Sequence, residues 1–168
     1  MIDIRMQRGK QWLEQLLHLT GVPANVEAEL ETTQQSSDLQ EPDIYWLKID
    51  ETNLKPEQIQ VLIGFEGTVL DAIQYLANAS LNLTQKPEQQ ASYTVELNGY
   101  RVQRQAEIQA LALAAAEQVR SSGQEVEIKS LSSAERRQIH TFLKEFTDLE
   151  TFSRGKEPHR HLVVRQLQ

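Results

Sequence analysis

Two basic side chains stand at a spacing that could bind an anion. Arg136 and His140 are four residues apart, so on a helix they share one face, and Lys144 extends that stripe by another turn. A guanidinium and an imidazole about 6 Å apart can hold one phosphate between them or stack on a planar ring. The stripe lies beside an apolar face, so we expect these cations at the surface. An ordinary solvated helix face would have the same spacing.

Arg137 adjoins this stripe on the same helix, and more basic side chains follow around a turn-rich segment at 154–158. They are Arg154, Lys156, His159, Arg160 and His161. Residues 132–168 hold seven basic and five acidic side chains, a local charge of +2. His159 and His161 alternate and could face one side of a strand, but zinc needs a third ligand and Asp148 is only a guess for it. We therefore predict no metal site and no catalytic residues.

Gly64, Phe65, Glu66 and Gly67 form a second pattern, a Gly-x-x-Gly link between two segments of helical spacing. Two glycines let the backbone approach a ligand closely, and the amides at the start of the second helix point at an anion. A plain corner between two helices would show the same pattern. Binding is favoured by the placement of the link, because a strand is predicted on each side of the helix pair.

Apolar periodicity predicts the elements that must position these side chains. The expected helices lie around 12–17, 56–63, 68–77, 108–119 and 133–146, and the expected strands at 26–32, 44–49, 93–97, 126–128, 149–152 and 162–167. Residues 33–42 are polar and are expected to form a loop. Ser132 and Glu135 form a capping box, which predicts that the last helix starts there.

The order of elements is α-β-β-α-α-β-α followed by β-α-β-β, which is typical of the α+β class. We expect two modules, residues 1–123 ending in a linking helix and residues 124–168. The net charge of −7 is unevenly spread, because residues 1–99 carry −9 and residues 100–168 carry +2. Much of the acidity comes from outward positions such as Glu27, Glu29 and Glu31. The total charge therefore does not exclude an anionic partner for the second module.

Composition excludes several classes of protein. The chain has 168 residues and no cysteine, so disulfides, thiolate nucleophiles and zinc–thiolate sites are excluded. No apolar run approaches ~18 residues, so we expect no membrane span. The first ten residues carry charges where a signal peptide needs an apolar stretch. Trp12 and Trp46 are expected in the core.

Three stretches of the chain resemble the bacterial Jag (SpoIIIJ-associated) family. Residues 62–76, which contain the Gly-x-x-Gly link, are similar to its KH segment. Residues 134–143 resemble the start of its second domain, which is called R-three-H after its Arg-x-x-x-His, and residues 155–164 resemble the last turn and strand of that domain. The resemblance extends from Leu13 to Val164.

The resemblance implies a type II KH-like module followed by an R-three-H module. The implied ligand is single-stranded RNA in the cytoplasm, with single-stranded DNA as an alternative, and the implied role is that of an RNA chaperone or post-transcriptional regulator. The family often pairs with a smaller single-KH protein and implies neither a cofactor nor enzymatic activity. Gly64 and Gly67 match the backbone-clamping loop, and Arg136 and His140 match the signature. Arg160 matches an Arg of the closing strand, where His161 replaces a second Arg.

Phe65 and Glu66 stand where the family usually carries Lys or Arg. A carboxylate facing a phosphate costs on the order of 1 kcal/mol at about 4 Å in solvent, so we expect the Gly-x-x-Gly loop to be auxiliary to the Arg-x-x-x-His stripe. Two alternatives stay open. One is a protein-interaction scaffold with a degenerate KH module, and the other is a nuclease built from three histidines, His140, His159 and His161.

Overall fold

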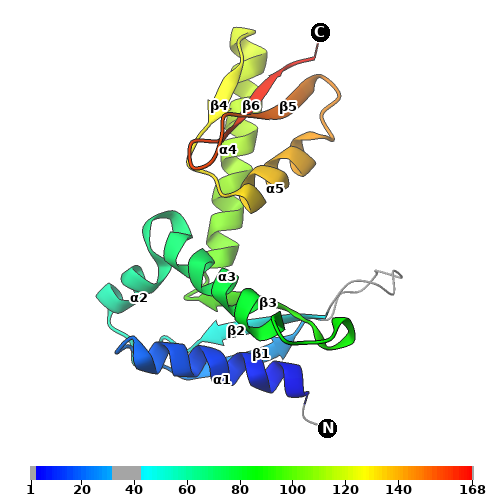
Figure 1. Cartoon of the computed structure of the whole chain (residues 1–168). Helices are drawn as coiled ribbons and strands as arrows, with labels where there is room; N and C mark the ends of the chain where they lie inside the picture. The colour runs from blue at the N-terminus through cyan, green and yellow to red at the C-terminus, as the bar shows by residue number, and fades with distance from the viewer. Residues whose placement is uncertain (1–2, 32–42, 168) are drawn as a thin grey trace. The chain divides into compact units, whose positions relative to one another are not determined.

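The structure, a computed structural model, describes residues 3–31 and 43–167 and divides the chain into two compact units, Met1–Arg101 and Val102–Gln168. Each unit has a three-stranded sheet with helices packed against it (Figure 1). The predicted mixed α+β class is confirmed. The loop expected at 33–42, and Thr32 of the first expected strand, lie outside the described residues.

The elements of the first unit follow the predicted order. They are α1 (Ile4–Leu19), β1 (Val26–Leu30), β2 (Ile44–Ile49), α2 (Pro56–Ile63), α3 (Thr68–Asn82) and β3 (Ser92–Leu97), with 3-10 turns η1 (Phe65–Gly67) and η2 (Pro87–Gln89). Strand β2 pairs antiparallel with β1 and parallel with β3. Because parallel neighbours need a crossover connection, the chain between β2 and β3 includes both α2 and α3.

One face of this sheet carries the core of the first unit. Tyr45, Leu47 and Ile49 are buried because alternate side chains of β2 point to the same face. The apolar stripes of α1 and α3 complete the core. Trp12 packs against this core, whereas Trp46 alternates with the buried residues and lies half-buried outside the core cluster. The expectation that Trp46 is a core residue is therefore wrong.

The second unit contains most of α4 (Tyr100–Ser122) and all of the following elements. They are β4 (Val126–Ile128), α5 (Ser133–Leu143), β5 (Leu149–Arg154) and β6 (His161–Gln166). The strands pair antiparallel in the order β4-β6-β5. Side chains of α4, α5 and the three strands form one apolar cluster, which includes Ile108, Ala112, Ile139, Leu143 and Leu162. Leu111 of α4 is 44% exposed.

Helix α4 was expected to belong with the first module, up to Gly123. In the structure the compact units divide at Arg101, because the buried side chains of α4 pack in the second cluster. α4 is also the longest described helix, yet among residues 3–31 and 43–167 no helix has the length and apolar content that crossing a bilayer requires.

A polar network ties the start of α1 to the sheet of the first unit. Asp3 caps α1 by accepting a hydrogen bond from the Arg5 backbone N–H at 2.9 Å, and the Tyr45 hydroxyl also donates to its carboxylate. This hydroxyl, with help from the Arg5 guanidinium, lowers the pKa of Asp3 to about 2. The charged form of Asp3 is therefore favoured in the folded state.

We predict that Asp3 makes the first unit sensitive to acid. Because its pKa is lower in the folded than in the unfolded chain, its contribution to stability is present above about pH 4 and is lost as the pH falls towards 2. Urea unfolding followed by tryptophan fluorescence reports this unit, since Trp12 and Trp46 are the chain's two tryptophans. The stability difference between the wild type and Asp3→Asn should shrink between pH 6 and pH 3. A difference that does not depend on pH would contradict the prediction.

Candidate functional site

Helix α5 starts at the predicted capping box. The Ser132 hydroxyl accepts from the Glu135 N–H at 3.2 Å, and the Glu135 carboxylate accepts from the Ser132 N–H at 2.8 Å. Glu135 also accepts from the Arg104 guanidinium of α4 at 2.8 Å. The cap and this ion pair hold α5 so that Ile139 and Leu143 face the core.

The sequence predicted Arg136 at the surface, but in the structure this side chain is buried. Only 5% of it is exposed. Position 136 lies three residues before Ile139 and seven before Leu143, so it borders the buried face of α5. The long side chain therefore follows the apolar surface inward instead of pointing into solvent. The expectation that Arg136 lies at the surface is therefore wrong, and its pairing with His140 around one phosphate stays a prediction.

The buried guanidinium of Arg136 joins two segments that are distant in the sequence. It donates to the carbonyl oxygen of Leu131 at 2.8 Å, before α5, and to that of Arg160 at 3.2 Å, before β6. It also donates to the carboxylate of Glu157 in the turn between β5 and β6. Charged donors that bond two carbonyls and a carboxylate hold a loop firmly. Arg136 therefore positions the residues around it.

The turn between β5 and β6 depends on Gly155. Its φ is +90°, and a Cβ atom there would lie 2.8 Å from the carbonyl oxygen of His159. Any other residue would be strained by the positive φ, and its Cβ atom would clash with the His159 carbonyl oxygen. Gly155 thus allows the turn to close tightly, which brings His159 and Arg160 to the start of β6.

A hollow of about 280 Å³ lies where α5 meets this turn and β5. Its polar lining includes Ser133, Arg136, Arg137, His140, Ser153 and Arg160. The Nδ1 atom of His140 contacts the hydroxyl of Thr151, which orients the imidazole. In the described part of the chain, neither Arg137 nor Arg160 has an ion pair through its side chain. Their N–H groups are therefore available to an anion.

Two of the other predicted basic side chains form ion pairs with Glu125 and Glu127. Arg154 binds both carboxylate oxygens of Glu125, at 2.7 and 3.1 Å, and also reaches Glu127 at 3.2 Å. These hydrogen bonds from Arg154 lower the pKa of Glu125. The Nε2 atom of His161 lies 3.1 Å from Glu127. Arg154 and His161 therefore belong to an ion-pair cluster on the open face of the sheet.

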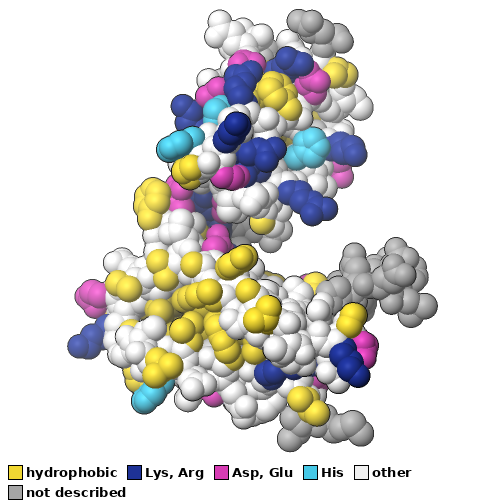
Figure 2. Space-filling view, in the orientation of Figure 1, with side chains coloured by type: hydrophobic (Ala, Val, Ile, Leu, Met, Phe, Trp, Pro, Cys, Tyr) yellow, Lys and Arg dark blue, Asp and Glu magenta, His cyan; other side chains and the backbone are white. Residues whose placement is uncertain are grey.

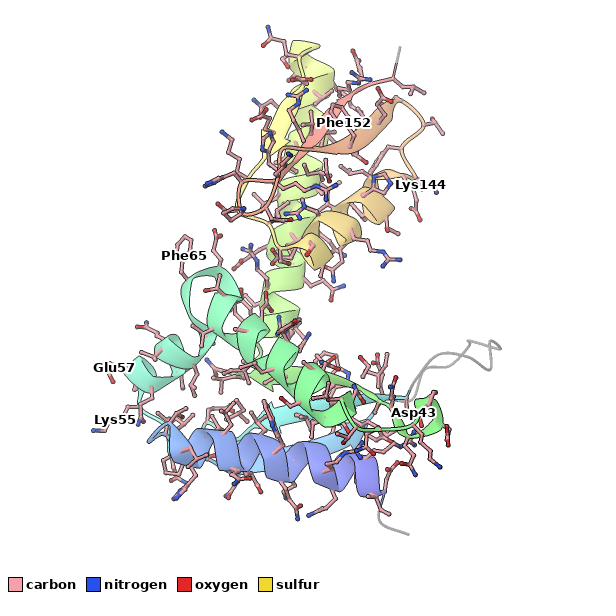
Figure 3. The ribbon with its side chains drawn as sticks, viewed as in Figure 1. Asp43, Lys55, Glu57, Phe65, Lys144 and Phe152 are labelled. Carbon is pink, nitrogen blue, oxygen red and sulfur yellow. The ribbon has the colours of Figure 1, made fainter. Side chains whose placement is uncertain are left out.

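Lys144, Lys156 and His159 are exposed and form no ion pair among the described residues. Lys144 lies at the C-terminal end of α5, where its side chain points outward (Figure 3). Neither Lys144 nor Lys156 lines the hollow beside α5 or a second hollow around Lys129 and His159. Figure 2 shows the basic side chains of the second unit interspersed with acidic ones.

Several residues of the site were not predicted from the sequence. Thr151, Phe152 and Ser153 belong to β5, and they come to α5 only because β5 pairs with β6. Phe152 (labelled in Figure 3) has the guanidinium groups of Arg154 and Arg165 over its ring, at 5.4 and 5.0 Å from the centroid. An aromatic residue inside a basic segment was the one signal that could have pointed to it.

The Gly-x-x-Gly link has structural reasons for both of its glycines. Gly64 and Gly67 have φ values of +75° and +79°. A Cβ atom on Gly67 would lie 2.4 Å from the hydroxyl oxygen of Tyr100, and one on Gly64 would clash with Val69. Phe65 is 79% exposed at the tip of the link (Figure 3), and Glu66 is half-buried. The link therefore offers a phosphate no basic side chain of its own.

The histidines do not converge on one point. His140 lines the hollow beside α5. His159 and His161 line a second hollow, which shares Arg160 with the first. Among the described residues, no three His, Asp or Glu side chains are grouped as metal ligands would be. The arrangement therefore favours anion binding over a metal centre built from these histidines.

Comparisons with known proteins identify a known domain within the second unit. The family model of the R-three-H domain matches residues 106–166. The RNA-binding protein KhpB of Bacillus subtilis is 32% identical over 110 residues, and that of Clostridium symbiosum is 26% identical over 154 residues. The RNA-binding protein KhpB of Lactiplantibacillus plantarum is 33% identical over 104 residues.

These similarities cover most of this chain but less of the relatives. The matched segments span 64%, 92% and 62% of this chain, and 52%, 63% and 32% of the three relatives. The chain thus covers less than two thirds of the length of each.

We predict that Arg136→Ala destabilises the second unit. A buried carbonyl that loses its partner costs about 1–3 kcal/mol, so the substitution should lower the free energy of unfolding by on the order of 2 kcal/mol. Amide hydrogen exchange of Ile139 and Leu143, both in the core of this unit, measures the effect.

The matched control is Arg137→Ala. Arg137 is the next residue of the same helix but is exposed, so its removal should change the same free energy by less than about 0.5 kcal/mol. If the two variants exchanged alike, Arg136 would not position the turn.

Proposed function

We propose that this chain, a KhpB-like protein with an R-three-H domain, binds single-stranded RNA through the second unit. The observation that carries the proposal is the hollow beside α5, where Arg137, His140 and Arg160 are exposed and Arg137 and Arg160 have no acidic partner among the described residues. The relatives are named RNA-binding proteins, which supports the same ligand. Single-stranded DNA has the same phosphates and is the alternative ligand.

The geometry suggests a division of labour within the site. Arg137 and Arg160 would donate to phosphate oxygens, since a guanidinium presents a planar fork of N–H groups. The hydroxyls of Ser133 and Ser153 lie in the same hollow and could donate to the same backbone. Arg136 would chiefly hold the Arg160 backbone in place, since its guanidinium already donates to two carbonyls and a carboxylate. Such contacts bind the backbone whatever the base sequence.

For the first unit we propose a type II KH-like module with an auxiliary role. Its support is the helix–Gly-x-x-Gly–helix segment between two parallel strands, with a third strand antiparallel to the first of them. Glu66 and the exposed Phe65 in the link argue against tight phosphate binding there.

The proposed role is that of a non-enzymatic RNA chaperone or post-transcriptional regulator in the bacterial cytoplasm. Its support is the likeness to the KhpB proteins together with a site that offers cations and hydroxyls. Sequence-independent backbone contacts suit a protein that handles many RNAs.

We predict that Arg137→Ala combined with Arg160→Ala weakens binding of labelled oligouridylate. Each exposed charge pair contributes up to about 1 kcal/mol, so removing two should raise the dissociation constant roughly tenfold. The slope of log K against log salt should become shallower by about 0.7 for each phosphate that the variant no longer neutralises. Fluorescence anisotropy at several salt concentrations measures both.

The charge-matched control is Arg120→Ala combined with Arg165→Ala, which also removes two charges. Arg120 is in the same unit and is already paired with Asp148 at 2.7 Å, and Arg165 is already paired with Glu150, so their removal should leave the affinity close to that of the wild type. An equal loss of affinity in the control and in the variant of Arg137 and Arg160 would mean that only net charge matters, and no binding by the wild type would refute the function.

A second proposed function, protein interaction, is favoured by the exposed face of α3. Val69, Ala72, Leu76, Ala79 and Leu83 follow at alternating spacings of three and four residues, and all five are exposed. Figure 2 shows apolar side chains gathered on the first unit. The one charged residue of α3, Asp71, is paired with Arg101 at 2.5 Å. An uncharged stripe at this spacing suits a partner helix with the same pattern.

The partner we propose for this stripe is a smaller single-KH protein, whose own helix at the equivalent place would be similarly uncharged. Such pairing would be nearly symmetric, since each helix would offer the same kind of surface.

We predict that Leu76→Glu abolishes this pairing, because a buried unpaired carboxylate is costly. Light scattering of the full chain mixed with a single-KH protein from the same genome, after nuclease treatment, measures the complex. Leu19→Glu is the control, since Leu19 is 75% exposed at the end of α1 and lies off the stripe. A complex that survives Leu76→Glu would exclude the stripe as the interface.

A further inference from the structure

A second hollow borders the β5–β6 turn and shares Arg160 with the one beside α5. It has a volume of about 420 Å³, and its lining consists of Lys129, Ser130, Pro158, His159, Arg160 and His161. Three segments of the second unit therefore meet here, namely the end of β4, the turn and the start of β6. Lys129 and Ser130 were not predicted as part of any site.

Basic groups dominate this second hollow. Lys129, His159, Arg160 and His161 all line it. Among the described residues, the one carboxylate paired with them is Glu127, which lies 3.7 Å from the Lys129 amine and 3.1 Å from His161. Lys129 is 73% exposed, and an exposed pair at such a distance is weak.

The charge of Glu127 is moreover shared, because Arg154 also lies 3.2 Å from it. The lining of the second hollow holds two permanent cations, Lys129 and Arg160, and no carboxylate. The second hollow is therefore suited to an anion.

Arg160 connects the two hollows, because it lines both. Its backbone oxygen is held by the buried guanidinium of Arg136, while its side chain has no ion pair in the described part of the chain. Arg160 is thus shared by two basic hollows, and its backbone is held in place. Successive phosphates of one strand could each contact one of the two hollows.

We propose that the second hollow binds a further phosphate of the same single-stranded RNA, so that the strand crosses Arg160 and is held on both sides of it. The inference rests on the proposed function. It adds Lys129 and His159 as contacts to the RNA backbone, and it makes affinity depend on the length of the strand. A backbone phosphate fits better than a base, because the lining is basic and holds no aromatic ring other than imidazole.

The test is a length series of labelled oligouridylates, from two to twelve nucleotides, measured by fluorescence anisotropy with the full chain. The dinucleotide has a single phosphodiester and can fill the first hollow alone. Affinity of the wild type should rise when the strand becomes long enough to cross Arg160. In the variant Lys129→Ala with His159→Ala, that rise should be reduced five- to tenfold, while dinucleotide binding stays unchanged.

Two controls keep the experiment decisive. Lys156→Ala removes an exposed lysine of the same turn that lines neither hollow, and it should preserve the length dependence. Amide NMR spectra show whether the double variant keeps its fold, as expected for the exposed side chains of Lys129 and His159.

The other outcomes overturn the inference in different ways. If the double variant matches the wild type at every length, the second hollow binds no RNA. If it weakens the dinucleotide equally, the two hollows are not separate contacts. If inorganic pyrophosphate displaces the labelled strand as well as an unlabelled long strand does, the second hollow is a site for free phosphate. If the wild type binds no oligonucleotide of any length, the proposed function itself has failed.

Discussion

The buried guanidinium of Arg136 holds together the two segments that form the surface of the second unit. Its N–H groups need oxygen partners because the side chain is almost fully withdrawn from solvent, and the Leu131 carbonyl, the Arg160 carbonyl and the Glu157 carboxylate provide them. The turn between β5 and β6 is thereby fixed against the start of α5. Both hollows border this turn, so the geometry of either one depends on a residue that points away from solvent.

The charged residues of the second unit fall into two sets with different surroundings. Arg154, His161 and Arg165 lie on the open face of the sheet, each beside a carboxylate. Arg137 and Arg160 lie around the turn and α5, where the described residues offer them no carboxylate. Like the exposed Lys144, Lys156 and His159, these two arginines can bind an anion without first giving up an ion pair. The two arginines are the ones that line the hollow beside α5.

In the first unit the fold itself explains the two glycines of the Gly-x-x-Gly link, but it does not explain the exposed apolar residues. Gly67 is required by the approach of Tyr100, so the Gly-x-x-Gly pattern does not by itself indicate a ligand. The exposed Val69, Leu76 and Leu83 of α3 have no such explanation within the fold. Apolar side chains at regular helical spacing are costly to leave in water. The surface of this unit is therefore better suited to a protein than to a nucleic acid.

The sequence by itself determined the order of helices and strands, the capping box at Ser132 and the unequal charge of the two halves, because these depend on neighbouring residues and on composition. It also determined that Arg136 and His140 share a helix. Only the tertiary structure decided that Arg136 turns inward, that Arg154 is bound to Glu125, and that Lys129 comes beside His159. The direction of a long charged side chain depends on which oxygen atoms the fold brings within reach. Two of the three partners of Arg136, and the Glu125 partner of Arg154, lie more than twenty residues away in the sequence. Local spacing holds no information about such distant partners.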